Sequence, residues 1–237
     1  MMNTAVGLKI IGISLALILL VFVLGLFELY TQLGRYKSYW EKSNQKPAIP
    51  NEILYVALGD STAQGIGATS PQRGYVGLIG TELETRQSKP VRVVNLSKSG
   101  AKIVDVLNTQ LLQLEKLGVN SKTVITIEIG ANNIVSYNES EFESQMDELM
   151  GKLPKQALIS DIPYFGESRH KSRQPNVANA NEIMYRLAEK HGFKLVALNE
   201  QMQKNGGVKT FAPDWFHPSN VAYRENWAPV FLNRIEL

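Results

Sequence analysis

The sequence contains no cysteine among its 237 residues and only three histidines. The lack of cysteine excludes disulfide bonds, thiolate metal sites and a cysteine nucleophile. Neither sign of charge is in large excess, because 25 basic and 22 acidic side chains leave a net charge of only +3. So small an excess gives no general case for a nucleic-acid partner. Repeats and low-complexity tracts are absent, and the length fits one domain with an appendage.

One long apolar run stands near the N-terminus. Residues 10–27 read IIGISLALILLVFVLGLF, a stretch without charge that reaches the length of a transmembrane helix. A cleaved signal peptide fits less well, because its apolar part is usually roughly 7–15 residues long and no A-x-A-like site follows here. A buried core helix is disfavoured because the run is apolar all round. We expect the following apolar and aromatic residues to extend the helix or anchor it at the membrane interface: Leu29, Tyr30, Tyr36, Tyr39 and Trp40.

These observations divide the chain into three parts. We expect residues 1–30 to form a transmembrane anchor, residues 31–50 a linker that contains Pro47 and Pro50, and residues 51–237 the folded domain. The expected location is therefore a membrane, with a single N-terminal pass. Lysine and arginine are more numerous after the apolar run than before it, which leans toward a domain on the cytoplasmic side.

Apolar runs of strand length recur through the domain and do not alternate strictly, as is typical of strands buried on both faces. We expect five strands, at residues 53–58, 91–95, 123–129, 157–160 and 194–198. Stripes of apolar residues at helical spacing separate these runs. The alternation predicts an α/β fold with a parallel sheet and helices on both of its faces.

In such a sheet the functional site lies beyond the carboxyl ends of the strands. Ser61 follows the first expected strand in the sequence GDSTAQG, while Asp214 and His217 stand before the last helix in DWFH. At this i, i+3 spacing the aspartate can reach Nδ1 of the imidazole and leave Nε2 free to face a serine. Hydrolysis by serine needs such a base, a group that orients it, and donors for the developing oxyanion.

Two further residues are candidate oxyanion donors. Gly100 in SKSGA offers a backbone N–H with no side chain in the way, and Asn132 in GANN offers a side-chain amide. With the N–H of Ser61 they would form a three-donor oxyanion hole. Taken singly, Ser61 also fits a helix cap and Asn132 a turn residue. A metal held by the Asp/His pair is disfavoured, because no third ligand stands at a suitable spacing.

The chain resembles the SGNH/GDSL-type hydrolases, a family of esterases and lipases. The resemblance spans about residues 53–232 and rests on four blocks that match in order: Gly59-Asp60-Ser61, Gly100 after Asn95-Leu96-Ser97, Gly130-Ala131-Asn132, and Asp214-x-x-His217. It implies a flavodoxin-like, three-layer α/β/α fold and ester hydrolysis or acyl transfer. By the same resemblance the catalytic residues are Ser61, Asp214 and His217, and the oxyanion hole is formed by Ser61, Gly100 and Asn132.

The sequence departs from the family pattern at two positions of these blocks. Thr62 stands where the family name expects leucine, a position that varies. Asn133 stands where the pattern has aspartate, so it keeps an acceptor but loses a charge. If that aspartate orders the loop that carries Asn132, this loop is less rigid here.

A basic segment, residues 168–173, follows the fourth expected strand on the side of the site. Four of its six residues are Arg, His or Lys. We interpret it as a solvated mobile loop. The alternative is a surface that attracts an anionic substrate or lipid head groups.

The main hypothesis is a membrane-anchored serine esterase that needs no cofactor and no metal. Its substrate would be a small-molecule, lipid or acylated-glycan ester. An O-acyltransferase with the same site remains open, as does a catalytically silent, membrane-tethered binding domain. An anion- or nucleotide-binding module is a further alternative, although the glycine pattern at Gly65 and Gly67 is incomplete for it.

Overall fold

In a computed structural model that describes residues 4–236, four parallel strands form one sheet in the order β2-β1-β3-β4. This is the start of the flavodoxin-like strand order. The strands are β1 (Ile53–Gly59), β2 (Val91–Asn95), β3 (Val124–Glu128) and β4 (Leu158–Ile159). Gly59 at the end of β1 pairs with Glu128 at the end of β3, so the two central strands finish at the same level.

The expected fifth strand is not formed, and the sheet has four strands rather than five. Within residues 194–198 only Val196 joins the sheet, through a single parallel bridge to Ser160. Its N–H donates to Ile159 O (2.8 Å), and its carbonyl accepts from Asp161 N (3.1 Å). Because β4 has only two residues and the chain enters a helix at Leu198, there is no further backbone to extend this pairing.

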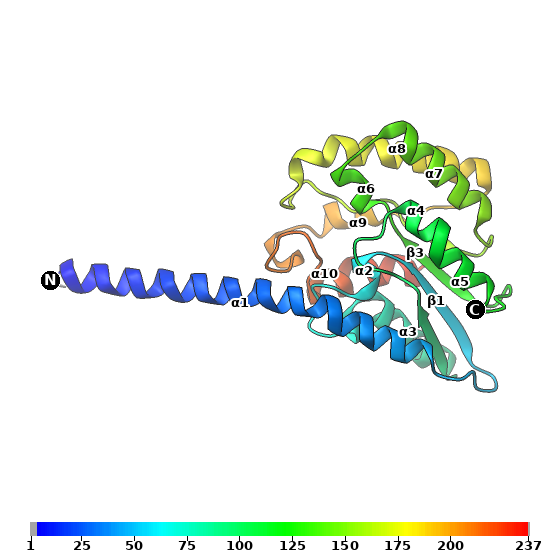
Figure 1. The fold of residues 1–237 in the computed structure, drawn as a ribbon, viewed down its shortest axis with the longest axis horizontal. Helices are drawn as coiled ribbons and strands as arrows, with labels where there is room; N and C mark the ends of the chain where they lie inside the picture. Colours follow the sequence, from blue (N-terminus) through cyan, green and yellow to red (C-terminus); the bar gives the residue numbers. More distant parts are fainter. Residues whose placement is uncertain (1–3, 237) are drawn as a thin grey trace.

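Helices lie on both faces of the sheet (Figure 1). They are α1 (Thr4–Asn44), α2 (Ser61–Gln64), α3 (Tyr75–Gln87), α4 (Ile103–Asp105), α5 (Leu111–Glu115), α6 (Ala131–Val135), α7 (Glu139–Lys152), α8 (Gln174–His191), α9 (Leu198–Lys204), α10 (Asn220–Ala222) and α11 (Ala228–Leu232). A π-helical turn joins α4 to α5 (Val106–Gln110) and another joins α10 to α11 (Tyr223–Trp227), so each pair forms one continuous helical segment.

The two faces of the sheet bury separate hydrophobic cores. On one face, apolar side chains of α4 to α8 pack against the strands, with Ile127 and Phe142 among the fully buried ones. On the other face, α3, α9, α11 and the carboxyl half of α1 do so, around Tyr55 and Tyr75. The strands therefore read as continuous apolar runs because neither face meets solvent.

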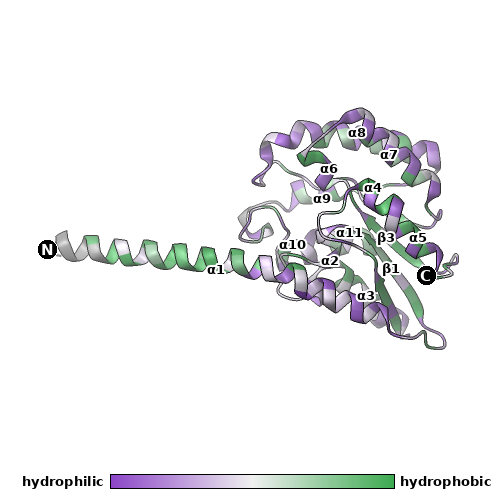
Figure 2. Ribbon diagram, in the orientation of Figure 1, coloured by the Kyte–Doolittle hydropathy of each residue, from purple (hydrophilic) through white to green (hydrophobic). Residues whose placement is uncertain are grey.

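Helix α1 is unbroken from the apolar run through residue 44, so most of the segment expected as a linker is helical. The amino-terminal half stands clear of the domain and is hydrophobic on all sides (Figure 2). Its apolar window has a mean hydropathy of 3.1, and none of that window is buried. By length and composition this helix is able to cross a membrane, a property that it shares with signal sequences.

The carboxyl half of α1 lies along the domain and is fixed there by buried polar side chains. Gln32 donates through Nε2 to Ala68 O (3.1 Å) and accepts through Oε1 from Gly67 N (2.9 Å). One turn further on, the Tyr36 hydroxyl donates to the same Ala68 carbonyl (2.6 Å), and Trp40 Nε1 donates to Gln64 O (3.0 Å). The aromatic residues Tyr36 and Trp40, expected at the membrane interface, are thus buried against the domain instead.

Replacing Gln32 tests this attachment. Gln32→Ala leaves Gly67 N–H without its buried acceptor, so we expect the free energy of unfolding to fall by about 1–3 kcal/mol. Urea denaturation of the full chain in detergent micelles, followed by tryptophan fluorescence, measures this change. Lys37→Ala is the control, because Lys37 is exposed on the outer side of the same helix. Equal stability of the two variants would contradict the attachment.

Candidate active site

Ser61 is the first residue of α2, directly after β1. The preceding Asp60 caps this helix, since its Oδ1 accepts from Thr62 N (2.9 Å). Gly59 permits the close approach of β1 to β3: its φ is +141°, and a Cβ there would lie 2.2 Å from Glu128 O. The amide of Gln110 bonds both the N–H and the carbonyl of Gly59 (2.8 Å each), which fixes the strand end that presents Ser61.

Asp214 and His217 form a tight turn in front of α10. Asp214 Oδ1 accepts from the backbone N–H groups of Phe216 (3.1 Å) and His217 (3.0 Å), which closes the turn. Trp215 adopts the left-handed region with φ +56°, an unusual conformation for a bulky residue. The hydrogen bonds of Asp214 therefore hold the turn in this unusual conformation. The turn places the Asp214 carboxylate beside the imidazole of His217.

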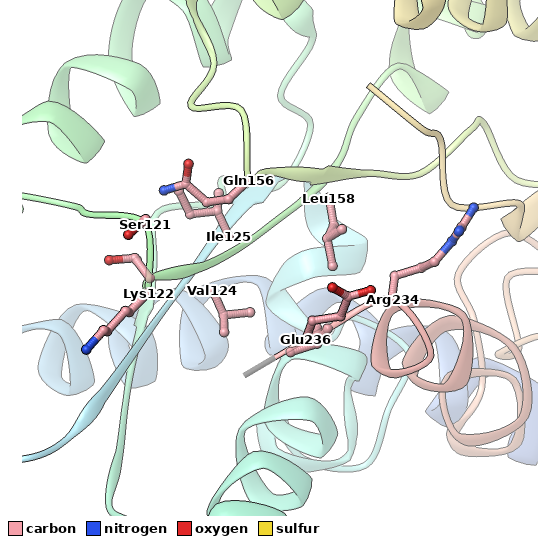
Figure 3. A pocket seen from close by; sticks show the side chains of 10 residues that line it. Ser121, Lys122, Val124, Ile125, Gln156, Leu158, Arg234 and Glu236 are labelled. Carbon is pink, nitrogen blue, oxygen red and sulfur yellow. The ribbon is translucent and has the colours of Figure 1, made fainter. Parts of the chain in front are cut away.

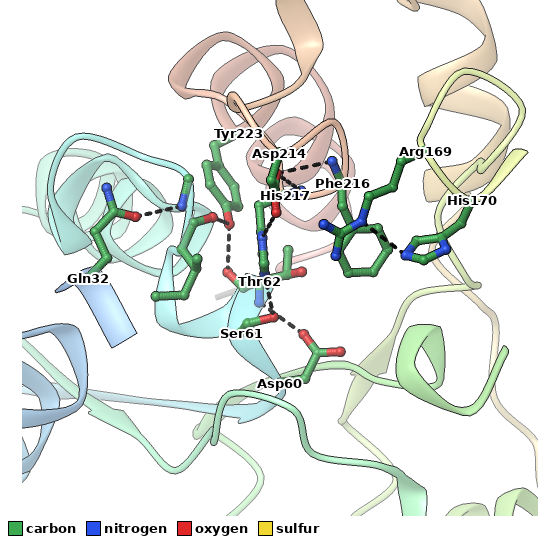
Figure 4. Close-up of polar contacts among 12 residues, drawn as sticks. Gln32, Asp60, Ser61, Thr62, Arg169, His170, Asp214, Phe216, His217 and Tyr223 are labelled. Atoms are coloured by element: carbon green, nitrogen blue, oxygen red, sulfur yellow. Dashed lines mark hydrogen bonds and ion pairs between the residues drawn. The ribbon is translucent and has the colours of Figure 1, made fainter. Parts of the chain in front are cut away.

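The side chains of Ser61, His217 and Asp214 form a continuous hydrogen-bonded chain (Figure 4). His217 Nε2 lies 3.1 Å from Ser61 Oγ, and His217 Nδ1 lies 2.7 Å from Asp214 Oδ2. Burial raises the pKa of Asp214, but hydrogen bonds from the His217 ring and backbone and attraction to its charge outweigh burial, so the pKa is lowered overall. Asp214 is thus held as a carboxylate that fixes the orientation of the ring.

Asn132 lies in α6, on the loop that follows β3, and its side chain reaches across to the Ser61 turn. Its Nδ2 donates to Asp60 Oδ2 and to Ala101 O, both at 3.0 Å. Gly100 precedes Ala101 in a left-handed conformation (φ +78°), with open space where a Cβ would stand. The Asn132 side chain therefore ties together the three loops that carry Ser61, Gly100 and Asn132.

Asn133 retains an anchoring role despite its missing charge. It is buried, and its Oδ1 accepts from Ile103 N (3.2 Å) at the start of α4. The loop that carries Asn132 is thus still bonded to the neighbouring helix. Thr62 is buried within α2, and its carbonyl accepts from the Tyr223 hydroxyl (3.2 Å).

Two buried acids behind Ser61 were not identified from the sequence as a pair. Glu128 is fully buried, and neither carboxyl oxygen has a hydrogen-bond partner in the described part of the chain. Burial, and next the charge of Asp60, raise the pKa of Glu128 well above its ordinary value. Burial also raises the pKa of Asp60 to about 6, against the hydrogen bonds of Thr62 and the attraction of His217. The sequence does carry a signal, because Glu128 is the one charged residue within the expected strand 123–129.

The basic segment 168–173 borders the Asp214–His217 turn. The backbone N–H of Arg169 donates to Trp215 O (2.8 Å), and its guanidinium lies 5.3 Å from the centre of the Phe216 ring. The imidazole of His170 meets the same ring edge-on at 5.0 Å. Burial, followed by the charges of Arg169 and Arg173, lowers the pKa of His170.

A pocket of about 250 Å³ lies at the opposite end of the sheet, where β3 and β4 begin (Figure 3). Lys122, Gln156 and Arg234 are among the residues that line it. None of its lining residues belongs to the hydrogen-bonded chain around Ser61. The candidate catalytic residues thus lie at the carboxyl edge of the sheet, as expected for an open α/β fold.

Comparison with known proteins identifies the family of the chain. Residues 57–225 match the model of the GDSL-like Lipase/Acylhydrolase family. The chain belongs to this family. The matched region contains all the candidate site residues, and membership makes the protein an ester-bond hydrolase. No similar sequence was found among curated proteins.

Solved structures of GDSL-like and related hydrolases share the fold. A lipase/acylhydrolase from Enterococcus faecalis is 21% identical, with a TM-score of 0.62 over 77% of this chain and 95% of that one. The acetyl xylan esterase AlAXEase is also 21% identical, with a TM-score of 0.62 over 78% and 100%. Axe2, an acetylxylan esterase from Geobacillus stearothermophilus, is 19% identical, with a TM-score of 0.59 over 78% and 94%. At these identities the likeness concerns the fold.

The buried acid Glu128 predicts a pH dependence of stability. A carboxyl whose pKa is raised by folding binds its proton more tightly in the folded chain than in the unfolded one. The protonated carboxyl makes its full contribution to the free energy of unfolding at pH values below its pKa in the unfolded chain. This contribution is lost as the pH rises toward its pKa in the folded chain. Glu128→Gln keeps the shape and removes the ionisable group, so its stability relative to the unchanged protein should increase steadily from pH 5 to pH 8.

Urea denaturation at a series of pH values measures this difference. The control is Glu84→Gln, because Glu84 is exposed on α3. Parallel stability curves for Glu128→Gln and the unchanged protein would show that Glu128 does not titrate as proposed.

Proposed function

We propose that the protein is a serine esterase, held at a membrane by α1, that hydrolyses carboxylic esters through an acyl-enzyme on Ser61. The observation that carries the proposal is the hydrogen-bonded chain from Ser61 through His217 to Asp214. Nucleophile, base and orienting acid in this order are what activation of a serine hydroxyl requires. Membership in the GDSL-like family supports esters as the substrates.

In the proposed reaction, Ser61 Oγ attacks the ester carbonyl carbon while His217 Nε2 takes the hydroxyl proton. Asp214 stabilises the resulting imidazolium through Nδ1. The tetrahedral intermediate collapses, the C–O bond to the alcohol breaks, and His217 returns the proton to the departing oxygen. Water then attacks the acyl-enzyme with His217 again acting as the base, which releases the carboxylic acid and restores Ser61.

The proposed oxyanion hole combines the N–H groups of Ser61 and Gly100 with the amide of Asn132. Two hydrogen bonds support its assembly at one point: Lys98 N donates to Gly59 O (3.2 Å), and Asn132 donates to Ala101 O (3.0 Å). To bind an oxyanion, Asn132 exchanges its bond to Asp60 for one to the negatively charged oxygen. Donors aimed at charge that develops in the transition state are a large source of rate enhancement.

The membrane anchor in this proposal is the amino-terminal half of α1. Support comes from its uncharged apolar run and from its exposure on all sides. Names of similar structures include a lipase/acylhydrolase and acetylxylan esterases, so lipid esters and acetylated glycans are both suitable first substrates.

Labelling with a fluorophosphonate tests the nucleophile. The full chain should be labelled at Ser61 and should hydrolyse p-nitrophenyl esters, and Ser61→Ala should abolish both. Ser121→Ala is the matched control, because Ser121 lies at the opposite end of the sheet and should leave both unchanged. A folded protein that is neither labelled nor active would overturn the esterase proposal and favour a binding domain.

Replacing Asn132 tests the oxyanion hole separately. Asn132→Ala should lower kcat by about 10²–10³-fold, the usual cost of one lost donor. Asn132→Asp, which keeps the size but replaces the N–H donors with a carboxylate, should lose at least as much. The measurement is steady-state hydrolysis of a soluble p-nitrophenyl ester, with circular dichroism to confirm folding. Full activity of Asn132→Asp would exclude Asn132 as a donor.

A further inference from the structure

The loop that carries Asp214 touches α1 within its apolar run. A Cβ added to Gly25 would lie 2.8 Å from Cγ of Pro213, so the helix backbone packs directly on the proline ring. Pro213 immediately precedes Asp214 in the chain. Leu29, one turn further along α1, is buried with Ala212 in the same cluster. The candidate catalytic turn is thus attached to the point where the apolar helix leaves the domain.

The position of this contact along α1 sets its depth. Gly25 precedes the end of the apolar run by two residues, which corresponds to about 3 Å along the helix axis. From Leu8 to Leu24 the large apolar side chains are exposed, whereas the buried face of α1 begins at Leu29. In a bilayer crossed by residues 10–27, Ala212 and Pro213 would therefore lie near the level of the lipid head groups. Figure 1 shows this loop, in orange, on the side of the domain from which α1 projects.

The outer side of the same loop presents aromatic surface. Trp215 is 43% exposed, and its ring stacks on that of Phe211 at 6.3 Å. Trp215 is exposed at a position of positive φ, while the side chain of His217 is bonded to Ser61 and that of Asp214 to His217. Tryptophan favours the membrane–water interface, because its ring is apolar and its N–H is polar.

Positive charge lies beside this aromatic surface. The backbone N–H of Arg169 donates to the carbonyl of Trp215, and Lys171 and Arg173 follow in a short 3-10 turn. Within the part of the chain that the structure describes, none of these three cations forms an ion pair. The acidic residue of this loop, Glu167, accepts instead from Gly207 N (2.7 Å). Such a cluster next to a bilayer attracts anionic head groups.

We propose that Phe211, Trp215 and the basic residues Arg169, Lys171 and Arg173 form a rim that contacts the bilayer in which α1 is anchored. The active site then opens onto the head-group layer, and its substrate is an amphiphilic carboxylic ester that resides in that bilayer. This inference rests on the proposed function and on the proposed anchor. It assigns to the basic segment the lipid-contact role that was the alternative to a solvated loop.

Intrinsic fluorescence tests the contact directly. The chain has three tryptophans, of which Trp40 and Trp227 are only 4% and 2% exposed, and Trp40 stands about 20 Å beyond the apolar run along α1. The full chain in nanodiscs made with lipid brominated near the head group should lose emission relative to unbrominated nanodiscs. In Trp215→Phe most of this quenching should disappear. Equal quenching in both proteins would overturn the proposed rim.

Activity distinguishes the inference from the function on which it rests. Lys171→Gln combined with Arg173→Gln should lower hydrolysis of an amphiphilic ester in anionic vesicles several-fold and leave fluorophosphonate labelling of Ser61 unchanged. The control, Lys116→Gln with Lys122→Gln, makes the same charge change on exposed residues outside the rim. Labelling without Trp215 quenching would disprove the rim alone. Quenching without labelling would disprove the esterase proposal alone.

The contact of Gly25 with Pro213 offers a second, independent variant. Gly25→Leu forces α1 and Pro213 apart, whereas Gly12→Leu makes the same substitution in the same apolar run at a point with open space. Quenching of Trp215 by brominated lipid should change in Gly25→Leu and stay constant in Gly12→Leu. Identical quenching in the two variants would show that α1 does not set the depth of the loop.

Discussion

The pairing of β1 with β2 on one side and β3 on the other is the constraint on which the rest of the structure depends. Because all three strands run in parallel, they deliver their following loops to one edge of the sheet. The register that pairs Gly59 with Glu128 brings Ser61 and Asn132 close enough for the bond between Asn132 and Asp60. That register requires glycine at position 59, since any side chain there would strike the neighbouring strand. The position of the polar residues at the carboxyl edge therefore follows from the pairing of the apolar strands β1, β2 and β3.

The two halves of helix α1 differ in their surroundings, although the helix is continuous. In its first half the side chains that the structure describes are all exposed, while the second half inserts Gln32, Tyr36 and Trp40 against the backbone that follows Ser61. These hydrogen bonds satisfy carbonyl and N–H groups in a tight loop that is too short to satisfy them itself. The helix that carries the apolar run thus also stabilises the segment that presents Ser61.

The proximity of most candidate site residues could be predicted from sequence, because each block lies next to a strand end or a helix start and carries its own local signature. The Asp214–His217 turn is the clearest case, since its geometry is decided within four residues. What could not be predicted depended on distant partners. Residues 194–198 have the composition of a strand, but the two-residue β4 offers them too little edge. Tyr36 and Trp40 suit a membrane interface as well as a protein surface. Only their helical spacing with Leu29 and Gln32, which places all four on one face of α1, favours packing against the domain.

The unbroken course of α1 has a mechanical consequence. The helix contains no proline, and its 41 residues extend about 60 Å without a joint. If its first half lies in a bilayer, as proposed, while its second half is fastened to the domain, the protein lacks the slack of a flexible tether. The movements left to it would then be lateral drift and rotation about the helix axis, so the search for a substrate in that bilayer would be two-dimensional. Surface density, rather than bulk concentration, would then govern how often the enzyme meets an ester.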